Sequence, residues 1–542
     1  MGPAFLLAAI IFLPTIGAIL LCLHDRESEG TMRSTALTFT ILTFGATLLL
    51  LASYYDSSDP GMQPVVQSGE EIVQRGVSYE WIASWNIYFR LGYDGISMPL
   101  ILLTSFICVL AMLASWSIKK HVRGYLILFL LLETGMLGVF LALDFFLFYV
   151  FWEVMLLPMY FLIGIWGGTR KEYAAIKFFL YTLAGSVLML IAMLMFYFGT
   201  DQNFNLMELA SMAERAEPNT IFANPTLQVT AFILLFIGFA IKVPTFPFHT
   251  WLPDAHVEAP TPISMILAGV LLKMGGYGLL RVAFPLCPYG TQAAAWTLVF
   301  IGAFSIIYGA FAAMAQTDFK RLVAYSSVSH MGYVIVGMAI WKINESTGNT
   351  TNMNYWHMGI NGAMFQMIAH GISSAGMFFM VGVLYDRVHH RNLNEFGGIA
   401  GIMPLYSGLA AGLFFAGLGL PGLCGFIGEV FVTLSSWSYA PGLAVVVASG
   451  VILTAGYILW TLQRVLLGPE YLGPHREALV PMNRREVFVA GVLLVSAIVL
   501  GVCPFLMFDM MEGSTEQLTE SMAKGYQAAL QYVEEAATAM TE

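Results

Sequence analysis

Long, uninterrupted apolar runs are the feature that most constrains this chain. About fourteen stretches of roughly 20 mostly hydrophobic residues follow one another along the sequence. A run of that length crosses the hydrocarbon core as an α-helix, whereas the strands of a membrane barrel are shorter and alternate in hydrophobicity. The chain is therefore predicted to be an all-α polytopic membrane protein. The predicted spans are 3–23, 35–55, 92–115, 124–142, 145–166, 173–199, 228–248, 262–283, 294–314, 322–341, 358–384, 404–434, 442–466 and 487–508.

The composition excludes the soluble classes of protein. Of the 542 residues, 58% are hydrophobic and 11% are charged, whereas a soluble domain has about 25% charged residues. No soluble core could absorb this much apolar surface. The net charge of −10 says little about partners, and we expect no nucleic acid among them. The five cysteines are scattered without a CxxC pair, so neither a disulfide nor a metal centre is expected.

The basic residues predict how the spans are oriented. Fifteen of the 24 lysines and arginines, Lys320 among them, fall in connections after odd-numbered spans, six fall on the opposite side and three lie within spans. Because basic loops stay in the cytoplasm, both termini are predicted to lie on the outer side of a bacterial cytoplasmic membrane. Segment 1–21 lacks a basic start and a small-residue cleavage site, which predicts a retained span rather than a signal peptide.

Three connections are long, but none is long enough to form a soluble catalytic domain. Connections 54–91 and 200–227 are polar and predicted outside, and 468–486 is basic and predicted inside. They contain no glycine-rich phosphate loop, dinucleotide fingerprint or haem ligand pair, so no redox chemistry is expected in this chain. The tail 509–542 has apolar residues at three- and four-residue spacing, which predicts a helix. This helix is either a solvated amphipathic helix on the outer surface or one that clasps a neighbouring subunit.

Two spans are predicted to be broken by proline. The seventh contains Lys242-Val243-Pro244, and the long twelfth contains Gly-Leu-Pro-Gly at 419–422. Proline removes a helix hydrogen bond, and such breaks are tolerated at membrane depth where they line a polar cavity. The separation of the breaks by five spans predicts two inverted five-helix repeats, which suit access from both faces. The predicted divisions are 1–123 (three helices and an outer loop), 124–283 and 294–466 (one repeat and half-channel each) and 467–542 (inner loop, last span and outer tail).

A short set of ionisable residues lies within the spans, where a lysine at mid-depth costs roughly 2.5–3.5 kcal/mol on insertion. The set is Glu133, Glu153, Lys177, Lys242, Lys273, His330, His370 and Glu429. A buried carboxylate and a buried lysine change their proton affinity when one of them moves or the gap between them is hydrated. Histidine titrates near neutral pH. The row is therefore predicted to relay protons across the membrane.

Each of these residues also has a purely structural interpretation. Glu153 can be satisfied by a backbone donor, and a lone histidine on a span is often a packing residue. Lys177 lies where its side chain can extend to the inner surface. The inner connection 249–260 is either a cytoplasmic uptake point for protons or an ordered cap on the broken seventh helix. Its polar residues are His249, Asp254, His256 and Glu258.

Five segments carry a family resemblance when taken jointly. They are ALDFFLFYVFWEVMLLPMYFLIGIWG, the stretch 239–281, QTDFKRLVAYSSVSHMGYVIVG, MIAHGISSAGMFFMVGVLYDR and GLPGLCGFIGEVFV. Covering most of 141–433, they resemble the antiporter-like, proton-translocating membrane subunits of respiratory NADH:quinone oxidoreductase (complex I), in particular the chain M family. The resemblance implies fourteen spans with two inverted five-helix repeats.

The resemblance also implies roles for single residues. Glu153 and Lys242 match the coupled acid–base pair of the family, and Lys273 matches its central relay. His330 and His370 match the bridge between half-channels, and Glu429 matches the terminal donor to the outer side. The two sibling subunits usually carry lysine in place of Glu429, which favours the chain M family. Glu133 and Lys177 match the family pattern less decisively.

The implied partners are the other membrane subunits of complex I, including the two sibling antiporter-like subunits, together with the lipid bilayer and protons. No cofactor is expected in this chain, and NADH, FMN, iron–sulfur clusters and quinone are expected in partner subunits. Alternatives are a subunit of a multi-subunit sodium/proton antiporter or of a membrane-bound hydrogenase, which share these motifs. A quinone-site redox subunit and a passive scaffold are further alternatives.

Overall fold

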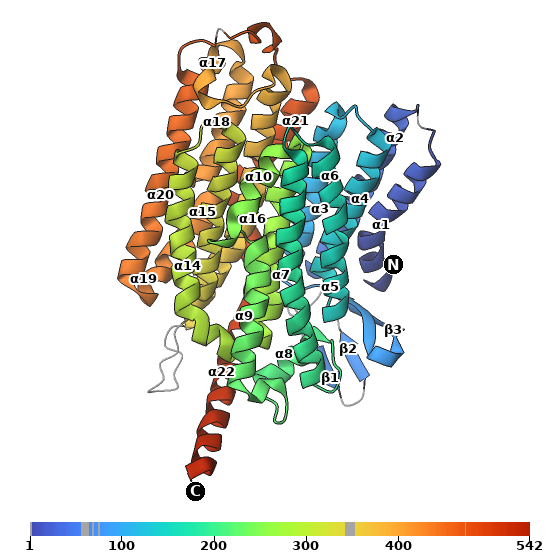
Figure 1. Cartoon of the computed structure of the whole chain (residues 1–542), viewed down its shortest axis with the longest axis vertical. Helices are drawn as coiled ribbons and strands as arrows, with labels where there is room; N and C mark the ends of the chain where they lie inside the picture. The colour runs from blue at the N-terminus through green and yellow to red at the C-terminus, as the bar shows by residue number, and fades with distance from the viewer. Residues whose placement is uncertain are drawn as a thin grey trace.

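The computed structural model describes residues 3–25, 27–55, 64–67, 70–73, 76–341, 353–471 and 473–541. Long helices run side by side along one axis of the molecule (Figure 1). Within the described residues, thirteen helical segments are long and apolar enough to cross a membrane. A further span, the predicted twelfth, is divided into two shorter helices. The prediction of an all-α polytopic membrane fold is therefore confirmed.

The N-terminal part contains three spans and two small hairpins. The spans are α1 (Pro3–Leu23), α2 (Glu29–Tyr55) and α3 (Met98–Ala114). The connection between α2 and α3, predicted only as a polar loop, contains the strands β1 (Pro64–Gln67), β2 (Glu70–Val73), β3 (Gly76–Ile82) and β4 (Ile87–Gly92). β1 pairs with β2 and β3 with β4, both antiparallel, and a register shift interrupts the second pair. The hairpins lie at the end of the bundle that also carries α8 (Leu206–Glu214) (Figure 1).

The next group of helices corresponds to the first predicted repeat. Its elements are α4 (Val122–Leu141), α5 (Phe145–Val154), α6 (Leu156–Trp166), α7 (Lys171–Gly199), α9 (Pro225–Lys242), α10 (Trp251–Glu258), α11 (Thr261–Ile266), the π-helical η5 (Leu267–Leu271), α12 (Leu272–Gly278), the π-helical η6 (Leu279–Ala283) and α13 (Phe284–Leu286). The elements from α11 to α13 form one continuous span.

The remaining helices correspond to the second predicted repeat and the C-terminal part. They are α14 (Pro288–Met314), α15 (Phe319–Ala339), α16 (Met353–Val388), α17 (Ile399–Ile402), α18 (Pro404–Leu418), α19 (Cys424–Tyr439), α20 (Pro441–Leu462), α21 (Arg484–Val502) and α22 (Phe505–Thr541). α17 and the connection before α21 lie at the end of the bundle opposite the hairpins (Figure 1).

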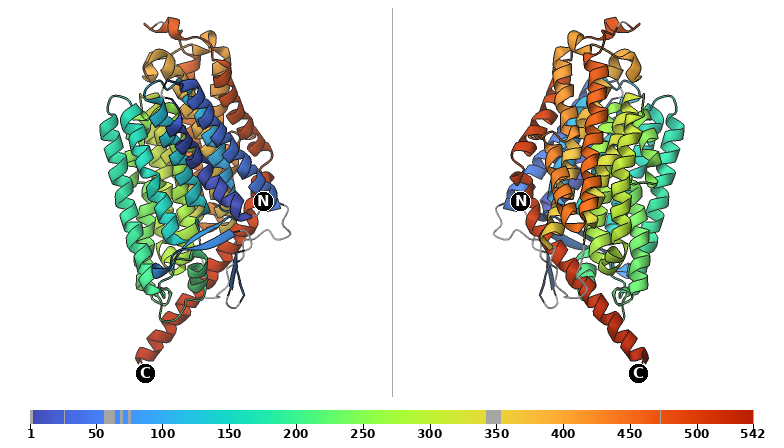
Figure 2. Two further views of the ribbon diagram at one scale, coloured as in Figure 1. Left: turned by 90° about the vertical axis from the view of Figure 1, so that its right-hand side faces the viewer. Right: turned by 90° about the vertical axis from the view of Figure 1, so that its left-hand side faces the viewer.

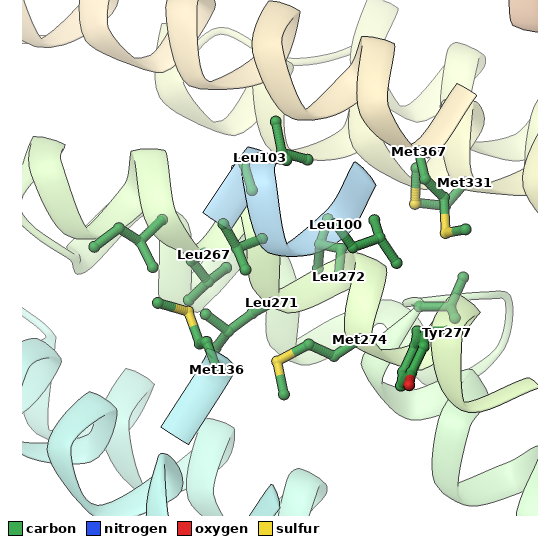
Figure 3. Close-up of a cluster of buried hydrophobic side chains, with 14 of the residues drawn as sticks. Leu100, Leu103, Met136, Leu267, Leu271, Leu272, Met274, Tyr277, Met331 and Met367 are labelled. Atoms are coloured by element: carbon green, nitrogen blue, oxygen red, sulfur yellow. The ribbon is translucent and has the colours of Figure 1, made fainter. Parts of the chain in front are cut away.

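Two spans form the centre of the bundle. The most apolar windows of the α11–α13 span and of α16 are wholly buried, whereas about two thirds of the corresponding windows of α1, α2 and α20 face outward. Apolar side chains from α3, α4, α15 and α16 gather around the α11–α13 span (Figure 3). Among them are Leu103, Met136, Met331 and Met367. A charged side chain on either central span is therefore kept from lipid by protein on all sides.

The seventh span differs from its predicted form. It was expected to run over 228–248 and to be followed by a polar inner connection, but α9 ends at Lys242 and α10 continues the chain after a turn. Pro244 and Pro247 cannot donate to a helix, so the hydrogen-bonded ladder stops there. Every residue of α10 is buried, because the helix packs against α7 and α15. The supposed connection is thus the second half of a broken helix.

The C-terminal tail is more buried than predicted. α21 ends at Val502 rather than near 508, because Pro504 interrupts the helix, and α22 then runs as one helix to Thr541. Its first part packs on α16, α14 and α8 of the same chain and buries Met511 and Met522. The far end of α22 extends obliquely beyond the bundle (Figure 2). The predicted helix is therefore present, and the apolar side of its first part lies on the bundle of its own chain.

Candidate functional site

Lys273 lies at the centre of the molecule on α12, directly after the π-helical η5. Its side chain is fully buried, and its Nζ atom donates a hydrogen bond of 2.5 Å to the carbonyl oxygen of Ala268. A π-helical turn disturbs the regular pairing of a helix and can present a carbonyl in this way. The Nζ atom also lies 2.6 Å from Nδ1 of His370 on α16. A buried amine is thus joined to an imidazole from the second predicted repeat.

The polar contacts continue from His370 to Glu429. The ring centroids of His370 and His330 are 5.5 Å apart. Nδ1 of His330 lies 3.2 Å from Oε1 of Glu429, and Nε2 of Gln366 lies 3.4 Å from the same ring nitrogen. All three predicted residues are buried. Lys273, His370, His330 and Glu429, here named the central row, therefore form one chain of titratable side chains within the protein.

The break in the twelfth span makes room for the carboxyl group of Glu429. Between α18 and α19, Gly419 and Gly422 adopt φ angles of +80° and +91°, which favour glycine. A Cβ atom placed on Gly419 would lie 2.5 Å from Oε2 of Glu429. Any larger residue would therefore be strained in its backbone and would press on the carboxylate. The Gly-Leu-Pro-Gly sequence thus ends α18 and also admits the acidic end of the central row.

Glu153 and Lys242 form a second group, which we name the lateral pair. Glu153 lies where α5 ends and α6 begins. The helix is interrupted there because the ring of Pro158 would clash with the carbonyl of Val154, four residues earlier, in a regular helix. Lys242 is the last residue of α9 and is buried. The two charges act on each other, and the hydroxyl of Ser186 also faces the carboxyl of Glu153.

Aromatic rings surround the amine of Lys242. Its Nζ atom lies 5.2 Å from the ring centroid of Trp152 and 5.7 Å from that of Phe178, and it has no hydrogen-bond partner among the described residues. Ring faces attract a cation, and more strongly where water is excluded. The amine is therefore held by the rings and by the distant charge of Glu153 rather than by a direct ion pair.

Two predicted members of the row lie apart from it. Glu133 on α4 is fully buried, and neither of its carboxyl oxygens has a hydrogen-bond partner among the described residues. Its charge acts on the thiol of Cys108 on α3. Lys177 on α7 forms an ion pair of 2.8 Å with Asp254 of α10. The structure therefore does not bring Glu133 and Lys177 into the central row, and Lys177 is paired rather than extended alone toward the surface.

Sequence reasoning missed two buried titratable groups. Lys320 was assigned to an exposed connection, but it lies on α15 with its Nζ atom bonded to the carbonyl of Ala259. Asp318 is the N-cap of α15, and its side chain accepts hydrogen bonds from the backbone N–H groups of Lys320 and Arg321. Recognising this N-cap in the sequence would place Lys320 within the helix. His256 was assigned to the inner connection, but its ring is buried and stacks on Phe378 with centroids 4.3 Å apart. No sequence pattern distinguishes it from a loop histidine.

The arrangement supports proton transfer within the membrane. Carboxyl, imidazole and amine groups can each accept and release a proton, and such transfer needs hydrogen-bond contact, either direct or through one water. No group of three or more histidine, cysteine or acidic side chains that could hold a metal ion occurs among the described residues.

Comparison with known proteins places the chain in one family. Residues 142–454 match the family described as NADH:quinone oxidoreductase/Mrp antiporter, and residues 75–143 match NADH-ubiquinone oxidoreductase chain 4, amino terminus. The chain is 40% identical over 523 residues to NADH-quinone oxidoreductase subunit M of Rhodobacter capsulatus, covering 95% of this chain and 96% of the relative. It is 36% identical to the subunit M of Rickettsia conorii, covering 94% and 97%.

Solved structures show the same architecture. A chain of respiratory complex I from Thermus thermophilus superposes with a TM-score of 0.81 at 28% identity, covering 95% of this chain and 99% of that one. A chain of the Mrp complex from Dietzia has a TM-score of 0.75 at 24% identity, covering 95% of this chain and 52% of that one, and shares the fold. The chain thus belongs to the NADH:quinone oxidoreductase/Mrp antiporter family, and its resemblance to the M subunits extends over nearly its whole length.

Proposed function

We propose that this chain moves protons outward across a bacterial cytoplasmic membrane as a subunit of NADH:quinone oxidoreductase. The M subunits that it resembles match it over about 95% of its length, and it is itself a multi-pass membrane subunit of such a complex. The central row is the observation that supports the proposal, because it joins four titratable side chains from four elements within the protein interior.

The lateral pair is the proposed switch. When a charge change reaches Glu153 from a neighbouring subunit, the hold on Lys242 weakens and its proton affinity changes. Lys273 then changes protonation in response, His370 and His330 carry the proton onward, and Glu429 releases it to the outer side. Each contact of the central row spans a distance that a side-chain motion or one water can close.

The drive comes from partner subunits. Moving a proton against the membrane potential costs about 2.3 kcal/mol per 100 mV, which quinone reduction elsewhere in the complex supplies. We infer that NADH, FMN, the iron–sulfur clusters and quinone bind to those partners. The two sibling antiporter-like subunits are the proposed membrane neighbours of this chain.

The proposed orientation follows from the distribution of basic residues. The end of the bundle that carries α17 is the cytoplasmic one, and both termini lie outside. Residues 124–283 and 294–466 are the proposed inverted repeats, each supplying one half-channel. The two broken helices, α9–α10 and α18–α19, support this division, because one break lies in each proposed repeat.

Replacement of Lys242 by alanine in the whole complex tests the function. The substitution removes the cation of the lateral pair, so we expect proton pumping and coupled quinone reduction to fall together. Both rates are measured in vesicles with NADH and a soluble quinone, with complex assembly checked on native gels. Wild-type rates of both activities would contradict the proposal.

A sodium/proton antiporter subunit is the second candidate, since an Mrp chain shares the fold. Purification of the native assembly separates the two candidates. Peripheral iron–sulfur and flavin subunits that co-purify with the chain indicate the oxidoreductase, whereas small membrane subunits alone indicate the antiporter.

A further inference from the structure

Lys273 shares its span with a second buried cation, Arg281. The α11–α13 span runs without a break through both residues, and Tyr277 lies midway between them in the sequence. Because residues four apart lie on the same face of a helix, Tyr277 and Arg281 continue the face of Lys273 toward one end of the bundle. Arg281 lies in the π-helical η6, and its side chain is only 10% exposed.

Arg281 forms a buried ion pair with Asp94 at the end of the bundle that carries the hairpins. Asp94 lies between β4 and α3, and its side chain is 8% exposed. The Nη2 atom of Arg281 donates a hydrogen bond to Oδ2 of Asp94. Oδ1 of the same carboxylate accepts hydrogen bonds of 3.0 Å from the backbone N–H groups of Ile96 and Ser97. Both carboxylate oxygens are therefore engaged, and the ion pair is fixed to the start of α3.

Tyr277 links this ion pair to the end of α4. Its hydroxyl accepts a hydrogen bond of 3.3 Å from Nε of Arg281 and donates one of 3.0 Å to the carbonyl oxygen of Phe140. The ring is fully buried and packs against those of Phe140 and Phe148, with centroids 5.1 Å and 6.5 Å away. Figure 3 shows Tyr277 among the apolar side chains around the span. Along the span, an aromatic layer thus separates Lys273 from the ion pair.

The hydrogen bonds of these three residues are complete, unlike those of the central row. No buried side-chain nitrogen or oxygen of Asp94, Tyr277 or Arg281 lacks a hydrogen-bond partner. In the central row, by contrast, neither Nε2 of His370 nor Nε2 of His330 has a partner among the described residues. Water enters a protein interior where buried polar atoms would otherwise lack partners. The central row therefore has atoms that can hold water, whereas the group around Arg281 has none.

We propose that Asp94, Tyr277 and Arg281, here named the seal, close the hairpin side of Lys273 to protons. A guanidinium group donates hydrogen bonds but does not release its proton, so a proton cannot pass through Arg281 from group to group. A proton on Lys273 therefore moves to His370 and leaves by the central row. A direct exit at the hairpin end, the outer end in the proposed orientation, would bypass that row and let protons flow back. The inference rests on the proposed function and adds a barrier to it.

The test measures the passive proton leak through the assembled complex in vesicles, without NADH. An acid pulse imposes a pH gradient, and a pH-sensitive dye inside the vesicles follows its decay. Arg281→Met leaves the buried carboxylate of Asp94 without its cation, and the milder Tyr277→Phe removes one hydroxyl but keeps the ring. Arg387→Met is the matched control. Arg387 forms a similarly buried ion pair of 2.8 Å with Glu486, whose side chains are 9% and 14% exposed, at the opposite end of the bundle.

We expect the gradient to decay several-fold faster in Arg281→Met and Tyr277→Phe than in the native complex, at equal amounts of complex on native gels. The control should leak no faster than the native complex. The Lys273→Met/Arg281→Met double variant should be tight again, because the leak passes through Lys273 into the first proposed half-channel. Native decay rates in both seal variants, an equally leaky control, or a double variant that still leaks would overturn the seal.

Pumping by the Lys273→Met single variant, driven by NADH in the same vesicles, separates the two proposals. If this variant stops pumping while both seal variants keep the gradient as well as the native complex does, the seal is wrong and the proposed function stands. If Lys273→Met pumps at the native rate, the proposed function is wrong and the seal falls with it.

Discussion

The Nζ atom of Lys273 lies 2.6 Å from Nδ1 of His370, and this contact joins the two predicted repeats. Lys273 comes from α12 in the first predicted repeat and His370 from α16 in the second. Both spans are at the centre of the bundle and are enclosed by apolar side chains (Figure 3). A proton that crosses from one half of the molecule to the other has a direct path at this contact.

Replacement of His370 by phenylalanine should stop transfer between the halves. The ring volume is kept, but the nitrogen that faces Lys273 is lost, so proton pumping should fall while the complex still assembles. Pumping in vesicles and the amount of complex on native gels provide the measurement. The His370→Phe/Glu429→Gln double variant should pump no worse than the worse single variant, and additive losses would contradict a shared route.

Replacement of Trp152 by leucine should weaken the lateral pair. The indole face lies 5.2 Å from the amine of Lys242, and a desolvated contact of this kind contributes about 2 kcal/mol. Trp152→Phe keeps an aromatic face and is the matched control. We expect slower pumping in Trp152→Leu and nearly normal pumping in the control. Equal rates in the two variants would show that the ring does not hold the cation.

Replacement of Gly419 by alanine should damage the acidic end of the central row. The φ angle of +80° disfavours a side chain at a cost of about 1–3 kcal/mol, and the new Cβ would press on the Glu429 carboxylate. Pumping and the thermal stability of the complex should both decrease. Gly408→Ala in α18 is the control, since its Cβ would meet no atom within 4 Å. A harmless Gly419→Ala would refute the role given to the break.

Replacement of Asp254 by asparagine should destabilise the contact between α7, α10 and α15. The carboxylate lies 2.8 Å from Lys177, 3.0 Å from Arg321 and 3.7 Å from Arg170, so three cations lose their shared partner. We expect a loss of about 1–3 kcal/mol, measured by thermal unfolding of the purified complex. Glu217→Gln, which removes an exposed ion pair with Arg215, should change stability by less than about 1 kcal/mol.

Asp94 should make the stability of the bundle end that carries the hairpins depend on pH in the acidic range. Burial alone would raise the pKa of Asp94, but Arg281 and the backbone N–H groups of Ser97 and Ile96 hold that pKa below its usual value. A lowered carboxyl pKa contributes stability above the unfolded value of about 3.9, and that stability is lost as pH falls through the folded value. Thermal unfolding between pH 7 and acidic pH should therefore show a smaller acid-induced loss in Asp94→Asn than in the native protein.

Much of the fold follows from local sequence. Spans such as 294–314 and 442–466 are recognisable because the cost of exposing polar backbone in lipid leaves a helix as the stable form. The proline breaks after Lys242 and at 419–422 also follow from local sequence, because a proline without an N–H removes a hydrogen bond from its own turn of the helix. By contrast, the local sequence of α10 predicts a polar connection, because the burial of this helix depends on packing against α7 and α15.

The sequence by itself determined which side chains are costly inside a membrane, because each such cost belongs to one residue in one span. Only the tertiary structure decided which of them meet. It joins Lys273, His370, His330 and Glu429, leaves Glu133 apart, and buries His256 and Lys320 inside the protein. The reason is physical: proton transfer needs hydrogen-bond contacts of about 3 Å, direct or through one water, between side chains of different helices. The rotation and depth of each helix are set by packing rather than by its own sequence.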